Sequence, residues 1–142
     1  MLKESLKVLH ADTFAMYLRA HYFHWNVTGP NFSEYHAFFS DVYEQLFAAV
    51  DPIAEHIRAI DEYAPGSFSR LSELATIKLD DTIPSDSDMM RKLETDNKKV
   101  LASLYSAYKD AESEKELGVA NFLQDRIDAH DKLGWMLRSF TK

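Results

Sequence analysis

Apolar residues recur at helical spacing along most of the chain, in four long stretches. These stretches cover residues 2–26, 33–62, 87–111 and 115–140. Apolar positions three and four residues apart share one face of an α-helix. The pattern therefore predicts four amphipathic helices that bury one face each in a common core. Pro52 interrupts the second stretch, where it predicts a kink.

The segments between the stretches differ in length, and this difference predicts the topology. The breaker Thr28-Gly29-Pro30-Asn31 separates the first two helices. Ala64-Pro65-Gly66 ends the second helix, and a connection of about 20 residues follows, with a short apolar segment at 68–74. A long crossover between two helix pairs is typical of ferritin-like bundles. We expect an all-α, ferritin-like four-helix bundle, with a short helix in the crossover between helices two and three, as one domain over residues 1–142.

Composition and charge limit the functions that the chain can have. Hydrophobic residues make up 46% of the chain, and 4 Gly and 4 Pro favour long helices over a turn-rich β fold. The sequence has no cysteine, so any metal must bind through His, Asp, Glu or water. The formal net charge of −7 opposes bulk attraction to nucleic acid and attracts cations. No apolar run approaches the roughly 20 residues that span a bilayer, and the N-terminus has no apolar signal core, so we expect a cytoplasmic protein.

Asp51 and Glu55 form an acidic pair on the second predicted helix. Residues four apart lie on one helix face, and this face points away from the apolar stripe that contains Leu46. Phe47 and Ala48 lie on the same outer side. A face that mixes acids with a large aromatic residue indicates an interface between subunits more than open solvent.

Two histidines flank the predicted turn between the first two helices. His24 ends the first helix and His36 lies in the first turns of the second, so an antiparallel pair can bring them together. The rise of a helix separates His36 from Asp51 by about 22 Å, which side chains of one chain cannot close. Two subunits that pack these helices antiparallel about a two-fold axis can close the gap, and they then form two equivalent sites.

Such a site offers two imidazoles and two carboxylates. This mixed ligation suits Fe(II), Mn(II), Zn(II) or Co(II), and affinity order alone does not select iron. Each residue also has an ordinary structural explanation. Asp51 and Glu55 can be solvated helix charges, His24 can cap helix carbonyls, and His36 can be a surface residue.

The motif that joins these residues resembles the signature of the Dps family of mini-ferritins. It runs His24-Trp25-Asn26-Val27-Thr28-Gly29-Pro30-Asn31-Phe32, then His36, then Asp51-Pro52-Ile53-Ala54-Glu55. The segment His130-Asp131-Lys132-Leu133-Gly134-Trp135-Met136-Leu137-Arg138 is similar to the last helix of that family. The resemblance thus extends over most of the chain.

The resemblance implies a shell of twelve subunits with a central cavity. It implies a ferroxidase site at the two-fold interface, with His24 and His36 from one chain and Asp51 and Glu55 from the other as metal ligands and catalytic residues. It also implies oxidation of Fe(II), typically with hydrogen peroxide, storage of a ferric mineral, and protection against oxidative stress.

Two departures from the family pattern change these expectations. Many members carry an acid four residues after the second histidine, where this chain has Ser40, and the neighbouring Asp41 points elsewhere on the helix. The second iron position is therefore expected to be weaker or water-filled. Members that bind DNA often use a lysine-rich tail. This chain has only Lys3 and Lys7 near one end, and Arg138 and Lys142 near the other.

Two further residues, Trp25 and His21, each have two possible roles. Trp25 is either a sink for oxidising equivalents or an interface aromatic residue, and His21 is either a residue behind the ligands or an ordinary surface or core residue. We interpret His10 and His56 as surface residues and His130 as a hydrogen-bonded core residue.

Three functions compete at this point. The first is a ferroxidase and iron-storage protein, and the second is a nucleoid-type DNA-binding protein with incidental metal binding. The third is a bundle whose interface metal only holds subunits together. The charge of −7 favours the first over the second, and repeated turnover of iron would exclude the third. Iron must also enter the shell, and Glu116 and Asp125 are either pore residues or solvated charges.

Overall fold

Four long helices and one short helix form the structure, and no strands are present. The computed structural model describes residues 1–142. The helices are α1 (Leu2–Asn26), α2 (Phe32–Ala59), α3 (Phe68–Leu74), α4 (Asp86–Ser113) and α5 (Leu117–Ser139). The predicted all-α class and the order of the elements are confirmed, and each predicted end lies within three residues of the observed one. The helix α2 continues through Pro52 without a break.

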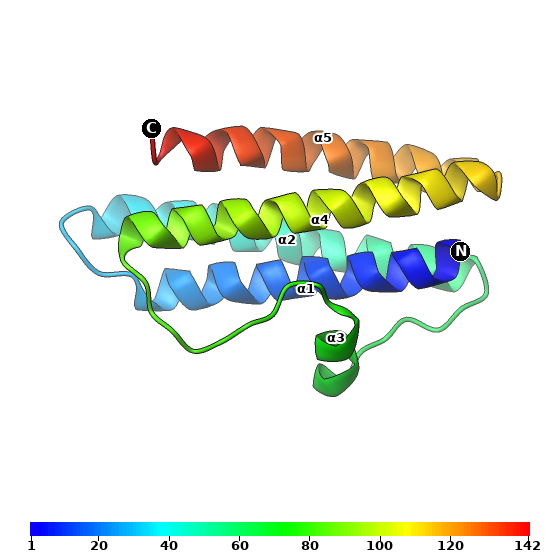
Figure 1. Cartoon of the computed structure of the whole chain (residues 1–142), viewed down its shortest axis with the longest axis horizontal. Helices are drawn as coiled ribbons and strands as arrows, with labels where there is room; N and C mark the ends of the chain where they lie inside the picture. The colour runs from blue at the N-terminus through cyan, green and yellow to red at the C-terminus, as the bar shows by residue number, and fades with distance from the viewer.

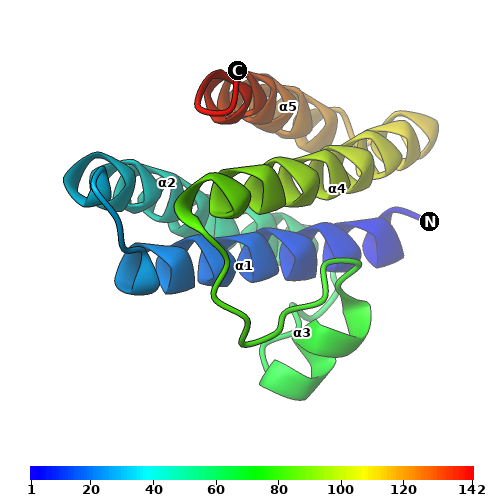
Figure 2. The ribbon, with the colours of Figure 1, turned by 60° about the vertical axis from the view of Figure 1, so that its left-hand side comes forward.

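The long helices run as two antiparallel pairs, α1 with α2 and α4 with α5 (Figure 1). The crossover between the pairs returns along the length of the bundle and carries α3, which packs against α1 (Figure 2). The helix α1 also packs against α4. This is the ferritin-like arrangement that the long connection predicted.

The helix ends follow from local sequence. The side chains of Ser67 and Ser85 cap α3 and α4 by accepting hydrogen bonds from main-chain N–H groups. Gly29 has a φ of 129°, a conformation that favours glycine and that allows the short turn between α1 and α2. Glu114, just past α4, accepts a hydrogen bond from the first amide of α1 at 2.7 Å, so the two helix ends are tied together.

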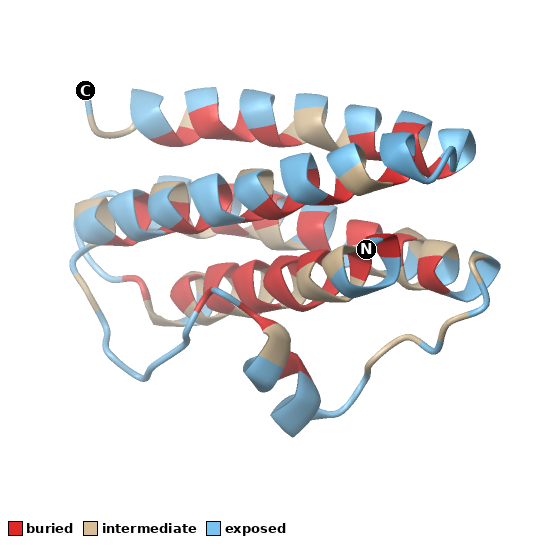
Figure 3. Ribbon diagram, turned by 45° about the vertical axis from the view of Figure 1, so that its right-hand side comes forward, coloured by how far each residue is buried: buried red, intermediate tan, exposed pale blue.

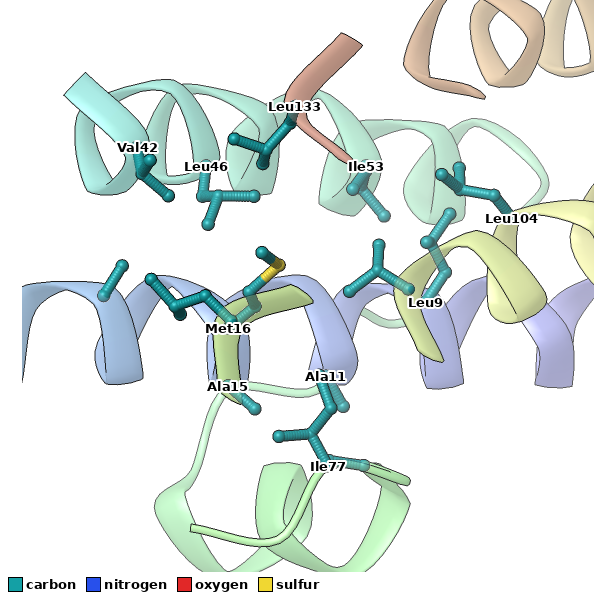
Figure 4. Packing of buried hydrophobic residues seen from close by; sticks show 14 of the residues in the cluster. Leu9, Ala11, Ala15, Met16, Val42, Leu46, Ile53, Ile77, Leu104 and Leu133 are labelled. Carbon is teal, nitrogen blue, oxygen red and sulfur yellow. The ribbon is translucent and has the colours of Figure 1, made fainter. Parts of the chain in front are cut away.

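Apolar residues of all five helices and the crossover meet in one core. Met16 of α1 points toward α2 near Leu46, and Leu9 points toward the neighbourhood of Ile53 and Leu104, as Figure 4 shows. The outer sides of α2, α4 and α5 are exposed, whereas α1 is buried over most of its circumference (Figure 3). The crossover covers the side of α1 that the bundle leaves free, which explains this extra burial.

The crossover makes one interpretation from the sequence wrong. His10 was expected at the surface, but only 5% of it is exposed. Its Nε2 donates a hydrogen bond to the carbonyl oxygen of Pro65 at 2.9 Å, just after the end of α2. Burial lowers the pKa of this imidazole, which favours its neutral form. His10 is therefore a core residue and not a surface residue.

Candidate metal centre

The imidazoles of His24 and His36 lie face to face across the turn between α1 and α2. Their ring centroids are 3.7 Å apart and their planes differ by 16°. Each Nδ1 donates a hydrogen bond to the main-chain carbonyl oxygen of the other residue, and both distances are 2.8 Å. The turn at Gly29 makes this reciprocal pairing possible because it brings the last turn of α1 beside the first turns of α2.

This pairing determines which nitrogen of each imidazole carries a proton in the neutral ring. A carbonyl oxygen accepts only, so each Nδ1 must carry the proton, and in the neutral ring each Nε2 then holds a lone pair. Metal-ligating histidines commonly use this arrangement, in which one nitrogen bonds the metal and the other donates to a carbonyl. The rings are half-buried, and Phe32 stacks on His36 with centroids 4.9 Å apart. The two rings are therefore held in one orientation, with each Nδ1 engaged, as candidate metal ligands would be.

The acidic pair lies elsewhere on the chain. Asp51 and Glu55 are both exposed on α2, on the side turned away from the core, as the sequence predicted. The exposed residues Phe47 and Ala48 share that side. Within one chain, no three His, Asp or Glu side chains gather where they can hold a metal ion. The fold thus brings the two histidines together but leaves the two acids on a separate exposed surface.

Ser40 lies one helical turn beyond His36 and is half-buried. Its hydroxyl is 3.5 Å from a carboxylate oxygen of the exposed residue Glu44. Asp41 instead lines a shallow hollow between α2 and α5 together with Lys132. The expectation that Asp41 does not substitute for an acid at Ser40 agrees with this placement.

A cluster of aromatic rings surrounds His24 on the α1 side. Tyr43 of α2 lies edge-on to His24 at 5.1 Å and stacks on His21 at 3.8 Å with an interplanar angle of 9°. Trp25 lies 4.1 Å from His21, and the hydroxyl of Tyr17 is 3.0 Å from the Nδ1 of His21. Burial, and then the neighbouring His24, lower the pKa of His21.

Sequence reasoning singled out Trp25 and His21 but missed Tyr17 and Tyr43. A signal was present, because Tyr17, His21 and His24 follow one another at spacings of four and three on α1. Such residues share a helix face. The pairing of Tyr43 with this face depends on the register of α2 against α1, which local sequence does not specify.

The surface around the cluster is apolar. Trp25, Phe47 and Phe68 are 59%, 58% and 82% exposed. A groove of about 220 Å³ between α1 and the crossover is lined by apolar residues, among them Phe14 and Leu18. Exposed aromatic residues beside an apolar groove are typical of surfaces that bind another protein surface.

The last histidine of interest lies in the core. Only 2% of His130 is exposed, its Nδ1 donates to the Asn97 side-chain oxygen at 2.7 Å, and its Nε2 is 3.2 Å from a guanidinium nitrogen of Arg126. Burial, and then the charge of Arg126, lower its pKa to about 3. The prediction of a hydrogen-bonded core histidine is confirmed.

Comparison with known proteins identifies the family. A family model of the ferritin-like domain matches residues 3–142. The chain is 32% identical to a low temperature-induced protein of Nostoc sp., over 92% of this chain and 74% of that protein. It is 30% identical to the DNA protection during starvation protein of Brevibacillus brevis, over 92% of this chain and 87% of that protein. The structure of a Dps protein from Vibrio cholerae O1 superposes with a TM-score of 0.94 at 27% identity, over 99% of this chain and 89% of that one.

The chain belongs to the Dps family of ferritin-like proteins. This membership confirms the resemblance that the motif around His24, His36 and Asp51 predicted. The Vibrio cholerae protein is described as a member of a broad superfamily of ferritin-like diiron-carboxylate proteins. None of the helices in this Dps-family chain is long and apolar enough to cross a membrane.

Proposed function

We propose that this Dps-family chain oxidises Fe(II) at sites shared between two subunits and stores the ferric product inside a hollow oligomer. His24 and His36 of one subunit, with Asp51 and Glu55 of another, bind the iron. Membership of the ferritin-like family supports an iron-storage and ferroxidase role in general. The cytoplasmic location and hydrogen peroxide as oxidant are further parts of this proposal.

The paired imidazoles carry the proposal. Reciprocal hydrogen bonds hold His24 and His36 so that both Nε2 atoms are free for a metal. A preformed ligand pair reduces the ordering cost of metal binding. Two nitrogen ligands leave coordination positions for carboxylates and for an oxidant, which suits a reactive site better than a closed structural one.

The exposed acids supply the remaining ligands when a second copy is present. The 15 residues from His36 to Asp51 span about 22 Å of α2. If two α2 helices pack antiparallel about a two-fold axis midway between these points, each histidine pair faces the acids of its partner. The exposed aromatic residue Phe47 lies between them and would be buried by the same contact.

The electron balance is met by two iron ions per site. Two Fe(II) ions supply two electrons, which with two protons reduce one hydrogen peroxide to two waters. In the shared site, the carboxylates of the second subunit would lie next to the imidazoles, lower the charge of the bound ions and favour Fe(III) over Fe(II). Ferric ions then hydrolyse and deposit as mineral in the cavity, to which Glu116 and Asp125, both exposed, are candidate entry residues.

Two single-ligand variants test the shared site. His24→Ala and Asp51→Ala should each strongly slow peroxide-dependent Fe(II) oxidation in stopped-flow measurements. Assembly should persist because neither change removes a large apolar surface. Asp128→Ala, which removes an exposed acid of α5 outside the proposed site, is the matched control and should oxidise iron normally.

Co-assembly of the two variants provides the decisive result. A mixed pair places both lesions in one site and leaves the other intact, so random mixing restores about a quarter of the sites. Activity that stays at the level of each variant alone would contradict a shared site. Repeated additions of iron distinguish the ferroxidase from a structural metal site, because only the ferroxidase oxidises each new addition.

A further inference from the structure

The carboxylate of Glu44 reaches back along α2 toward His36. Ser40 lies between the two residues, one helical turn from each. Side chains of a helix tilt toward its N-terminus, so a glutamate lies over the residue four positions before it. One carboxylate oxygen of Glu44 is accordingly 3.5 Å from the hydroxyl oxygen of Ser40. The helix rises about 6 Å from His36 to Ser40, a gap that two metal ions about 3.5–4 Å apart can bridge with one ligand bond at each end.

Ser40 leaves room for this carboxylate. The hydroxyl oxygen of a serine occupies the place where an aspartate has its carboxyl carbon. An acid at position 40 would therefore fill the space toward which Glu44 points, and two carboxylates four residues apart on a helix repel each other. The short neutral side chain of Ser40 thus allows the acid of the next turn to approach.

Glu44 shares the outer face of α2 with the acidic pair. A helix turns about 100° per residue, so Asp51 and Glu55 lie about 20° to either side of Glu44. Asp41 lies about 60° from Glu44 by the same count and lines the hollow beside Lys132. Of the two acids between His36 and Asp51, only Glu44 therefore lies on the face of the proposed site.

The carboxylate of Glu44 has no cationic partner. Glu44 is exposed, and none of the ion pairs of the chain includes it. Glu62 near the end of the same helix, by contrast, pairs with both Lys3 and Lys7. The oxygens of Glu44 are therefore available to a metal ion.

Two Fe(II) ions in one site need more negative charge than the acidic pair provides. The two ions together carry four positive charges, whereas Asp51 and Glu55 carry two negative charges. The imidazoles of His24 and His36 are neutral when they bind a metal through Nε2. A third carboxylate on the same face lowers the repulsion between the two ions.

We propose that Glu44 is a further metal ligand and holds the second Fe(II) of the shared site, an inference that rests on the proposed function. The paired imidazoles and the carboxylates of the second subunit bind the first ion, and Glu44 binds the other beside Ser40. A glutamate loses more side-chain freedom than a shorter acid when it is held in place. The second position is therefore filled, but at a higher Fe(II) concentration than the first.

Titration of the assembled protein with Co(II) tests this ligand without oxidation of the metal, because Co(II) suits the same ligands. Calorimetry should resolve two Co(II) ions per site in the wild type. Glu44→Gln keeps the size of the side chain and removes its charge. It should weaken binding of the second ion at least about tenfold and leave the first unchanged. Asp41→Asn is the matched control, because it removes an exposed acid of the same helix that faces away from the site, and it should bind as the wild type does.

A rescue experiment shows whether the position of the carboxylate matters. Ser40→Asp, added to Glu44→Gln, returns a carboxylate to the same space from the neighbouring turn, so the second Co(II) should bind again. Gln45→Glu in the same background restores the charge next to position 44 but in the hollow between α2 and α5. This second double variant should not recover the ion.

Two results would overturn the proposal. The first is Co(II) binding in Glu44→Gln that equals that of the wild type. The second is the loss of one ion for every two sites. That stoichiometry would place a single ion between two copies of Glu44 at the two-fold axis, and not one ion beside each Ser40.

His24→Ala tests the proposed site itself in the same titration, and it should remove the first ion. If His24→Ala binds both Co(II) ions as the wild type does, the shared site is wrong and the role of Glu44 fails with it. If His24→Ala loses the first ion but Glu44→Gln changes nothing, only the role of Glu44 is wrong.

Discussion

At the scale of single residues, the hydrogen bonds of the ring nitrogens decide which histidines are candidate metal ligands. His24 and His36 become candidate ligands because each Nδ1 is engaged by a carbonyl oxygen. His130 has the same imidazole but both of its nitrogens face partners within the core. The three side chains are chemically identical, and they differ only in whether a ring nitrogen is free to bind a metal. The sequence shows the residue type but not this difference.

The buried His130 should make stability depend on pH. Its pKa is lowered to about 3 in the folded chain, against 6.5 for the unconstrained residue. Below pH 6.5 the unfolded chain takes up a proton that the folded chain does not, so stability falls as the pH decreases toward 3. The slope for one such group is about 1.4 kcal/mol per pH unit.

Comparison with His130→Gln isolates this effect. The glutamine amide can still donate to Asn97 but does not titrate. At one protein concentration, the melting temperature of the wild type should fall more between pH 7 and pH 4 than that of the variant. Carboxylates titrate in both proteins and cancel in the comparison, so equal pH dependence would contradict the assignment.

At the scale of elements, the crossover is held to α1 by buried polar groups. The Asp12 carboxylate is fully buried and accepts hydrogen bonds from the main chain of Thr76 and Ile77 and from the hydroxyls of Thr76 and Ser103. Arg19 pairs with the buried Asp96 and also donates to the Lys78 carbonyl. These contacts place α3 and the apolar groove against α1, where the proposed interface lies.

Asp12→Ala should loosen this crossover. The change leaves four donors without an acceptor, and the two from Ile77 and Ser103 are buried, at a cost of about 1–3 kcal/mol for each that water cannot reach. Urea unfolding should show a loss of several kcal/mol in total, and hydrogen exchange should increase at residues 75–78. Asp88→Ala, which removes an exposed partner of Arg91, is the control and should change stability little.

At the scale of the whole molecule, large aromatic side chains near the candidate site remain exposed. Trp25, Phe47 and Phe68 are 59%, 58% and 82% exposed, and Asp51 and Glu55 are exposed on the outer side of α2 with Phe47. We propose that this surface provides both the interface and the missing ligands. Each subunit of a closed assembly uses this surface once. Loss of the interface would therefore remove both the oligomer and the proposed site.

We expect the protein to form a closed shell of about twelve subunits. Light scattering during size exclusion should give a mass near twelve times the chain mass of 16.4 kDa. Phe47→Lys, which places a charge on the uncovered surface, should shift the population toward smaller species. A wild-type monomer that persists at micromolar concentration would contradict both the shell and the shared site.

The protein should bind duplex DNA weakly at physiological salt. Affinity for DNA comes largely from Lys and Arg contacts to phosphate, and the chain carries a net charge of −7. The two lysines near the N-terminus are not free, because Lys3 and Lys7 both pair with Glu62. Retardation of plasmid DNA by micromolar protein, at about 0.15 M salt with EDTA, would show that a basic patch elsewhere outweighs this charge.

The sequence by itself determined the helices, the turn at Gly29, the long crossover and the family. These features depend on periodicity, on breakers and on a motif that includes His24 and His36, all of which are local. The exposure of Asp51 and Glu55 also followed from the helical period of α2. The assignment of these four residues to iron stays a prediction.

Only the tertiary structure decided which polar residues of α1 are buried and which rings touch. His10 and Asp12 lie inside because the crossover covers the face of α1 that periodicity treats as open. Tyr43 meets His21 and His24 because α2 packs on α1 in one particular register. Both outcomes depend on contacts between residues far apart in the sequence, and helical periodicity specifies the faces of a helix but not what covers them.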